Sequence, residues 1–96
     1  MYASVRRYEG VTDMRELTRR VNEGFIQIMR EIPGLVGYYC IDAGDGVVIS
    51  VSVFQDRTSA EESNARASDY VRESLALILP NPPQITAGEV VAHTAK

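Results

Sequence analysis

Cysteine, histidine and tryptophan are scarce or missing in this chain, and each scarcity excludes a class of site. Cys40 is the only cysteine, so no internal disulfide, no cysteine-based zinc site and no Cys-x-x-Cys metal-transfer motif can form. His93 is the only histidine, and it lacks both the further ligands of a metal site and the partners of a catalytic triad. We interpret His93 as structural or exposed, and we expect neither a metal nor a cofactor.

The chain also has fewer basic than acidic residues, and it has no long apolar run. The net charge is −3, from 10 basic and 13 acidic residues, and no basic patch is visible. Because proteins hold nucleic-acid phosphates with clustered basic side chains, we expect no nucleic-acid partner. No apolar run reaches the roughly 18 residues of a membrane span, and Met1–Arg7 lacks the apolar stretch of a signal peptide. We therefore expect no membrane partner and a cytoplasmic location.

The length of 96 residues predicts a single domain over residues 1–96. A domain of this size buries only about 60–65 % of its unfolded surface, so a lone copy would be marginally stable. With a disulfide excluded, a second copy of the chain is the natural supplement. We expect a homodimer.

The pattern of apolar residues predicts six elements. Between residues 13 and 31, Met14, Leu17 and Val21 begin a helical period, with Asp13 as the cap and Pro33-Gly34 as the stop. A second helix is expected to begin at Ser59, with Glu62 completing a capping box. In chain order the predicted elements are a strand at 2–8, a helix at 13–31, strands at 35–41 and 47–54 joined by a turn at 42–46, a helix at 59–78 and a strand at 84–93.

This order is the βαββαβ plan of the ferredoxin-like α+β fold, a four-stranded antiparallel sheet with both helices on one face. The other face is then bare, and stacking it against a twofold mate would give a dimeric α+β barrel. The strand at 47–54 alternates an aliphatic face with a mixed one. We expect the aliphatic face, Val47, Ile49, Val51 and Val53, to lie under the helices, and the mixed face, Val48, Ser50, Ser52 and Phe54, to line the barrel interior.

Asn64 is the leading site residue, because the helical register places its amide on the buried stripe of the second helix. In the functional interpretation Asn64 points into a pocket between helix and sheet, with Ser63 and Tyr70 as neighbours and Phe54 as a lid. In the alternative, Asn64 binds backbone or a water and the small residues beside it serve only close packing. No catalytic residue is assigned.

Charged and reactive side chains in the strands have simpler interpretations. Arg6 or Arg7 is expected to pair with Glu89, because the first and last strands are neighbours in this fold; an anion-binding spot is the alternative. Cys40 has no activating neighbour in sequence and is expected to be a buried, inert thiol.

Two segments resemble the antibiotic biosynthesis monooxygenase-like domains of the dimeric α+β barrel superfamily. They are Ile32-Pro33-Gly34-Leu35-Val36-Gly37-Tyr38, after the first helix, and residues 51–60, which run into the second. The resemblance covers essentially the whole chain and implies the fold and the dimer. Members include cofactor-free oxygenases of aromatic polyketides and haem-degrading enzymes. This chain departs from the oxygenating members in carrying Phe54 where they commonly have Trp, and it has no histidine between Thr58 and Leu79 to ligate a haem iron.

The resemblance implies a homodimeric domain that binds a small aromatic or apolar molecule. In the stronger form it oxidises a phenolic compound with O₂ and without metal or flavin, and a tyrosine hydroxyl holds the substrate. Tyr38 and Tyr39 point to opposite faces of their strand, and Tyr39 completes the candidate pocket with Asn64, Phe54, Ser63 and Tyr70. The alternative is a non-catalytic dimeric binding or stress-related domain.

Overall fold

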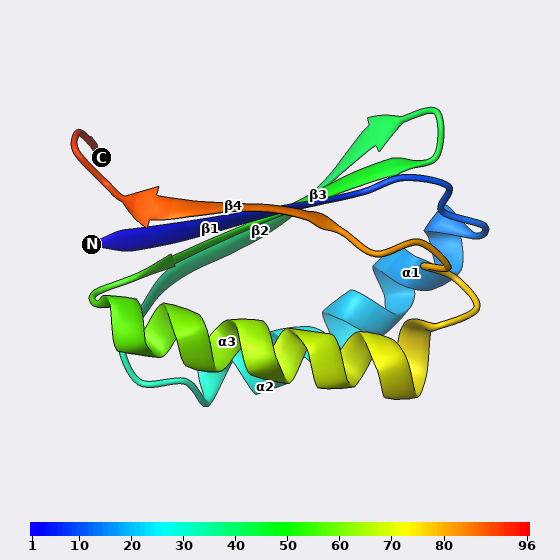
Figure 1. Cartoon of the computed structure of the whole chain (residues 1–96), viewed down its shortest axis with the longest axis horizontal. Coiled ribbons are helices and arrows are strands. Elements are labelled where there is room, and N and C mark those ends of the chain that lie inside the picture. The colour runs from blue at the N-terminus through cyan, green and yellow to red at the C-terminus, as the bar shows by residue number, and fades with distance from the viewer.

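The elements of the chain follow the predicted order in a computed structural model that describes all of residues 1–96 (Figure 1). The first helix changes from α to π geometry and back, and the second ends in a π-helical segment. In chain order the elements are β1 (Tyr2–Tyr8), α1 (Met14–Arg20), η1 (Val21–Phe25), α2 (Ile26–Arg30), β2 (Leu35–Gly44), β3 (Val47–Phe54), α3 (Arg57–Tyr70), η2 (Val71–Leu75) and β4 (Gln84–Glu89).

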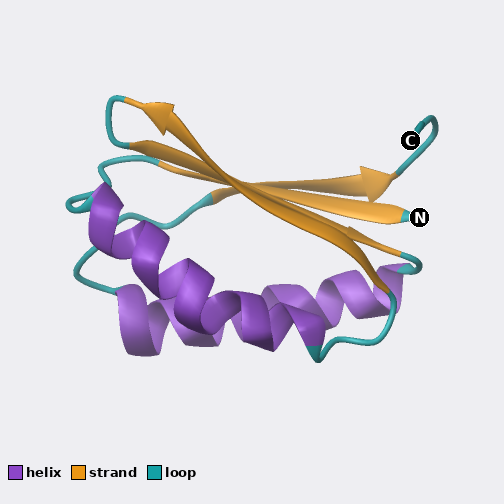
Figure 2. Cartoon of the chain, turned by 180° about the vertical axis from the view of Figure 1, so that it is seen from behind, coloured by secondary structure: helices purple, strands orange, loops and turns teal.

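The four strands form one antiparallel sheet in the order β2-β3-β1-β4. Both helices lie against the same face of this sheet, and the other face carries no element (Figure 2). This arrangement confirms the predicted ferredoxin-like α+β fold. No helix of the chain combines the length and the apolar character needed to cross a membrane.

Element boundaries differ from the prediction where side-chain chemistry sets them. The Asp13 carboxylate accepts from the Glu16 amide at 3.1 Å and caps the first helix as expected. The second helix begins at Arg57, because Asp56 accepts from the Ser59 amide at 2.8 Å and is the cap in place of Ser59. The β2–β3 turn is confined to Asp45 and Gly46, whose φ angles of 54° and 73° belong to the left-handed region of tight hairpin turns. Strand β4 ends at Glu89, four residues before the predicted end.

The orientation predicted for β3 is wrong. Val48, Ser50, Ser52 and Phe54 face the helices and are buried, whereas the aliphatic Val47, Ile49, Val51 and Val53 face outward and are only half-buried. A two-residue period separates the faces of a strand but does not say which one the helices cover. Ser50 is tolerated beneath the helices because its hydroxyl has a partner: it donates to the Tyr38 hydroxyl at 3.2 Å.

The hydrophobic core lies between the sheet and the helices, with Phe54 fully buried beneath the start of α3. On the opposite side, the strand register aligns a row of apolar residues that we call the outer sheet face. Its exposed members include Tyr39 and Ile41, which keep 65% and 45% of their surface open. The apolar residues of the outer sheet face are Ala3 and Val5 of β1, Tyr39 and Ile41 of β2, and Val47, Ile49, Val51 and Val53 of β3. Arg7 of β1 lies on the same side of the sheet, opposite Ile49.

Candidate functional site

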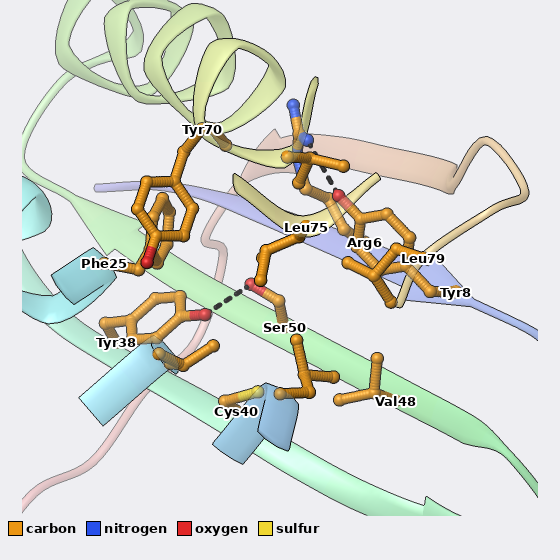
Figure 3. Close-up of a pocket in the computed structure, with 14 residues that line it drawn as sticks. Arg6, Tyr8, Phe25, Tyr38, Cys40, Val48, Ser50, Tyr70, Leu75 and Leu79 are labelled. Atoms are coloured by element: carbon orange, nitrogen blue, oxygen red, sulfur yellow. Dashed lines mark hydrogen bonds between the residues drawn. The ribbon is translucent and has the colours of Figure 1, made fainter. Parts of the chain in front are cut away.

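A small cavity lies between the helices and the sheet, with room of about 40 Å³, and three aromatic rings form one of its walls (Figure 3). The Phe25 ring contacts Tyr38 edge-on, with centroids 5.4 Å apart, and contacts Tyr70 at 5.3 Å. Phe25 comes from η1, Tyr38 from β2 and Tyr70 from the end of α3, so the wall joins both helices to the sheet. The remaining lining is mainly aliphatic and includes Leu75 and Leu79.

Four of the polar side chains that line the cavity come from the sheet and lie in two hydrogen-bonded pairs. Ser50 and Tyr38 form one pair, and the Arg6 guanidinium donates to the Tyr8 hydroxyl at 3.2 Å in the other (Figure 3). No Asp, Glu or His lines the cavity. The site therefore combines apolar walls with a few hydroxyl donors and one cation, an arrangement that suits a mostly apolar ligand with one or two oxygens.

The two titratable groups near the Ser50 pair are held in their neutral forms. Burial raises the pKa of Tyr38, and the neighbouring Cys40 adds to this rise, although the hydrogen bond from Ser50 opposes it. Cys40 is exposed as a residue, so the predicted burial is wrong. Desolvation of its sulfur nevertheless raises the pKa of the thiol; the hydrogen bond with Tyr38 opposes this rise and Asp42 adds to it. Neither group is ionised near neutral pH, so Tyr38 acts as a hydrogen-bonding hydroxyl and Cys40 is not activated as a nucleophile.

Two open grooves adjoin the cavity and share its walls. The first, of about 430 Å³, runs between α1 and the exposed edge of β2, and it shares Leu17, Val21 and Tyr38 with the cavity. We call the second, of about 290 Å³, the β1–η2 groove; it shares Arg6, Tyr8, Val71 and Leu79 with the cavity. The cavity therefore has a groove on each side, separated from it by residues common to both linings.

No group of three His, Cys, Asp or Glu side chains lies together in a geometry that would hold a metal ion. No protein-family model matches the sequence, and comparison with curated proteins finds no match either.

Solved structures, by contrast, share the whole architecture. A protein of unknown function from Nitrosomonas europaea matches with a TM-score of 0.79 at 16% identity, over 99% of this chain and 93% of that one. A monooxygenase from the ActVA-Orf6 gene of Streptomyces coelicolor, in complex with nanaomycin D, matches with a TM-score of 0.75 at 18% identity, over 99% and 91%. MhuD, with two manganese protoporphyrin IX molecules bound per active site, matches with a TM-score of 0.72 at 12% identity, over 100% of both chains.

The chain has the fold of the antibiotic biosynthesis monooxygenases. This confirms the resemblance drawn from the sequence at the level of fold.

Within this monooxygenase-like fold, only Tyr70 of the five predicted pocket residues lines the cavity. Its hydroxyl donates to the Arg20 carbonyl at 3.1 Å, so Tyr70 also joins the two helices. Ser63 bonds to the Ala60 carbonyl at 2.8 Å within α3, and Phe54 is enclosed in the core. Tyr39 lies on the outer sheet face and lines the groove on the β2 side, not the cavity itself.

Asn64 does not line the cavity but forms hydrogen bonds with Ser4 and Arg6 beside it. Its side-chain oxygen accepts from the Ser4 hydroxyl at 3.2 Å and from Arg6 Nε at 3.3 Å, and its backbone carbonyl accepts from an Arg6 terminal nitrogen at 3.0 Å. Asn64 is therefore a positioning residue for the Arg6 side chain.

The expected ion pair between Arg6 or Arg7 and Glu89 is wrong. The strand register sets Glu89 opposite Tyr2 and sets Ile85 opposite Arg6, while Arg7 pairs with Glu9 at 3.1 Å on the surface. Sequence reasoning also missed Tyr8 and Ser50 as cavity residues. A signal for Tyr8 was present in the alternation of Tyr2, Ser4, Arg6 and Tyr8, which places a polar row on one face of β1.

Proposed function

We propose that the chain is a homodimeric domain whose cavity binds a small aromatic, phenolic compound and oxidises it with O₂, without metal or flavin. The observation that carries this proposal is the wall formed by Phe25, Tyr38 and Tyr70, with the neutral hydroxyl of Tyr38 beside it. Aromatic walls favour a planar ring, and the hydroxyl gives that ring an orientation. The nanaomycin D and porphyrin complexes of proteins with this fold are consistent with a planar ligand.

The proposed chemistry needs no partner beyond O₂. A phenol with a free para C–H is converted to a quinone and water: the C–H and O–H bonds break, one oxygen atom of O₂ becomes the new carbonyl, and the other leaves as water with both hydrogens. The ring loses four electrons and O₂ gains four, so no external reductant is consumed. The protein supplies an orientation for the ring and walls that exclude water.

Binding requires the cavity to widen. Its room of about 40 Å³ is far below the roughly 150 Å³ of an apolar cavity that holds benzene. The adjoining grooves provide the missing space when the residues that they share with the cavity move aside. We therefore place one end of the ligand in the cavity and the rest in a groove.

The homodimer is part of the same proposal. The outer sheet face is mostly apolar, with Arg7 as a charged residue opposite Ile49, and an apolar surface of this kind is uncommon on a monomer. A twofold axis that brings this face against its own copy would bury it in a barrel between two sheets.

The test is titration with 1-naphthol, followed by oxygen uptake with 1-naphthol and catechol. Tyr38→Phe keeps the ring but removes the hydroxyl, and we expect oxygen uptake to fall about tenfold, the value of one hydrogen bond in the transition state. Tyr2→Phe makes the same change on β1, at a residue that lines neither the cavity nor the two adjoining grooves, and should leave uptake unchanged. Absence of both binding and oxygen uptake in the unmodified protein contradicts the proposal.

A second candidate is a binding domain without oxygenase activity. The absence of any Asp, Glu or His from the cavity lining favours it, because no residue there is suited to act as a general base. Saturable binding of 1-naphthol without oxygen uptake by any phenol would select this function over the first.

A further inference from the structure

The Arg6 side chain is buried without a counter-charge. Arg6 keeps only 5% of its surface exposed, and it takes part in none of the ion pairs of the chain. Its acceptors are all neutral oxygens, those of the Asn64 side chain, the Asn64 backbone and the Tyr8 hydroxyl. Burying a charge without an opposite charge is costly, and proteins ordinarily pair a buried arginine with a carboxylate. A buried guanidinium without a counter-charge is typical of an anion-binding site.

Arg6 and Tyr8 also have unused hydrogen-bond donors, which favours an anion as the missing partner. A guanidinium carries five N–H groups, and these contacts engage three of them, which leaves one N–H on each terminal nitrogen. Tyr8 accepts from Arg6 and keeps its own O–H proton to donate. Two N–H groups and one hydroxyl therefore remain for the two oxygens of a carboxylate, the geometry that arginine binds best.

The approach to Arg6 is electropositive in a chain whose net charge is negative. Arg6 lies where the cavity meets the β1–η2 groove, and the only charged residues lining that groove are Arg6 and Arg72. Arg72 is exposed and pairs with Asp69 at 2.8 Å, so Arg6 carries the uncompensated charge. The groove on the β2 side has Asp42 as its only charged residue. An anionic ligand is drawn to the β1–η2 side and repelled from the other.

We propose that Arg6 and Tyr8 form an oxyanion-recognition site, and that the molecules bound in the cavity are aromatic carboxylates that enter from the β1–η2 groove. The carboxylate lies against Arg6 and Tyr8, and the ring lies among Val71, Leu79 and the aromatic wall. Asn64 holds the guanidinium in position through its side chain and its backbone. This inference rests on the proposed function in one respect, that the cavity takes a planar ring, and it adds the charge of the ligand.

The test compares two ligands of nearly the same shape, 2-naphthoate and 2-naphthamide, by titration calorimetry at neutral pH. Charge-assisted hydrogen bonds from Arg6 predict that the carboxylate binds about tenfold to a hundredfold more tightly than the amide. Arg6→Met should remove this preference and leave the affinity for the amide within about threefold of its original value. Arg72→Gln is the matched control: it removes one positive charge from the same groove, and the preference should persist.

The outcomes separate this inference from the proposed function. If the unmodified protein binds both ligands equally well, the cavity binds rings but Arg6 serves only to hold α3, and the inference is wrong. If neither ligand binds, the proposed aromatic site itself fails, and the inference fails with it. The comparison in the unmodified protein needs no variant, so it decides the question even if Arg6→Met does not fold. Tyr8→Phe, which removes one donor and keeps the ring, should then lower the preference several-fold.

Discussion

Replacing Phe54 with alanine should lower the free energy of unfolding by about 3–5 kcal/mol, a large part of the 5–15 kcal/mol typical of a small domain. Phe54 is fully enclosed, lies opposite Leu35 and Tyr2 in the sheet, and is a member of the main hydrophobic cluster. Removing its ring sacrifices the transfer free energy of a large apolar side chain and leaves a cavity that the sheet and α3 cannot close. The affinity for 1-naphthol should not change, because Phe54 does not line the ligand cavity.

This prediction is checked by urea unfolding at a fixed protein concentration, since the stability of a dimer depends on concentration. Phe54→Leu restores most of the lost volume and should cost clearly less than Phe54→Ala. A loss below about 1 kcal/mol in Phe54→Ala would contradict the role of Phe54 in the core. A loss of ligand affinity in Phe54→Leu, with stability retained, would instead support the sequence-based prediction that Phe54 is a lid over the ligand pocket.

Introducing a charge at Val51 should convert the proposed dimer into a monomer. Val51 lies on the inner strand β3, between Val5 and Tyr39 on the neighbouring strands, near the middle of the outer sheet face. A glutamate there would be buried without a partner against the second copy, and the twofold relation brings in two such charges. At a cost of about 2–5 kcal/mol for an unpaired interfacial charge, the dissociation constant should rise between about thirtyfold and several thousandfold.

Analytical ultracentrifugation over a range of concentrations measures this effect. Leu77→Glu is a suitable control, because Leu77 is 90% exposed and lies beyond η2, on the helical side of the molecule. It adds the same charge at an apolar position but should leave the mass unchanged. If the unmodified protein is monomeric at tens of micromolar, the proposal that the outer sheet face is paired is wrong.

The order of the elements and the fold could be predicted from the sequence because local signals for them agree. The helical period from Met14 onward, the Asp13 cap and the Pro33-Gly34 stop all define one helix, and the structure places it at Met14–Arg30. Turn residues between two β-branched segments define the hairpin. The observed boundaries differ from the predicted ones by a few residues where a single side chain caps the element, as Asp56 does at the start of α3.

The faces of β3 could not be assigned in the same way. In most domains the more apolar face of a strand is the one covered, and that rule favoured Val47, Ile49, Val51 and Val53. It fails here because the hydroxyl of Ser50 has a hydrogen-bond partner, Tyr38, so the more polar face can be the covered one. An entirely aliphatic face turned away from the helices is expected if a second copy covers it, so the error is itself consistent with the proposed dimer.

The candidate site was located only in part, for a related reason. The prediction centred on Asn64 because an amide on a buried helical stripe is unusual, and Asn64 is indeed bonded into the site region through Arg6. Arg6 was assigned an ion pair with Glu89, since adjacent strands carry opposite charges. The register between β1 and β4 depends on how the whole sheet assembles, so it could not be predicted from either strand alone. In that register Arg6 lies away from Glu89 and is buried without an ion-pair partner.

The central claim is that the space between helices and sheet binds an aromatic molecule. It is tested most directly by following the methyl resonances of leucine, isoleucine and valine by NMR during titration with 1-naphthol. Binding in this space predicts saturable shifts at cavity methyl groups, including those of Val21, Val71 and Leu79, with the signals of Val5 and Ile49 on the outer sheet face unchanged. Shifts confined to the outer sheet face, or none at saturating ligand, would contradict it.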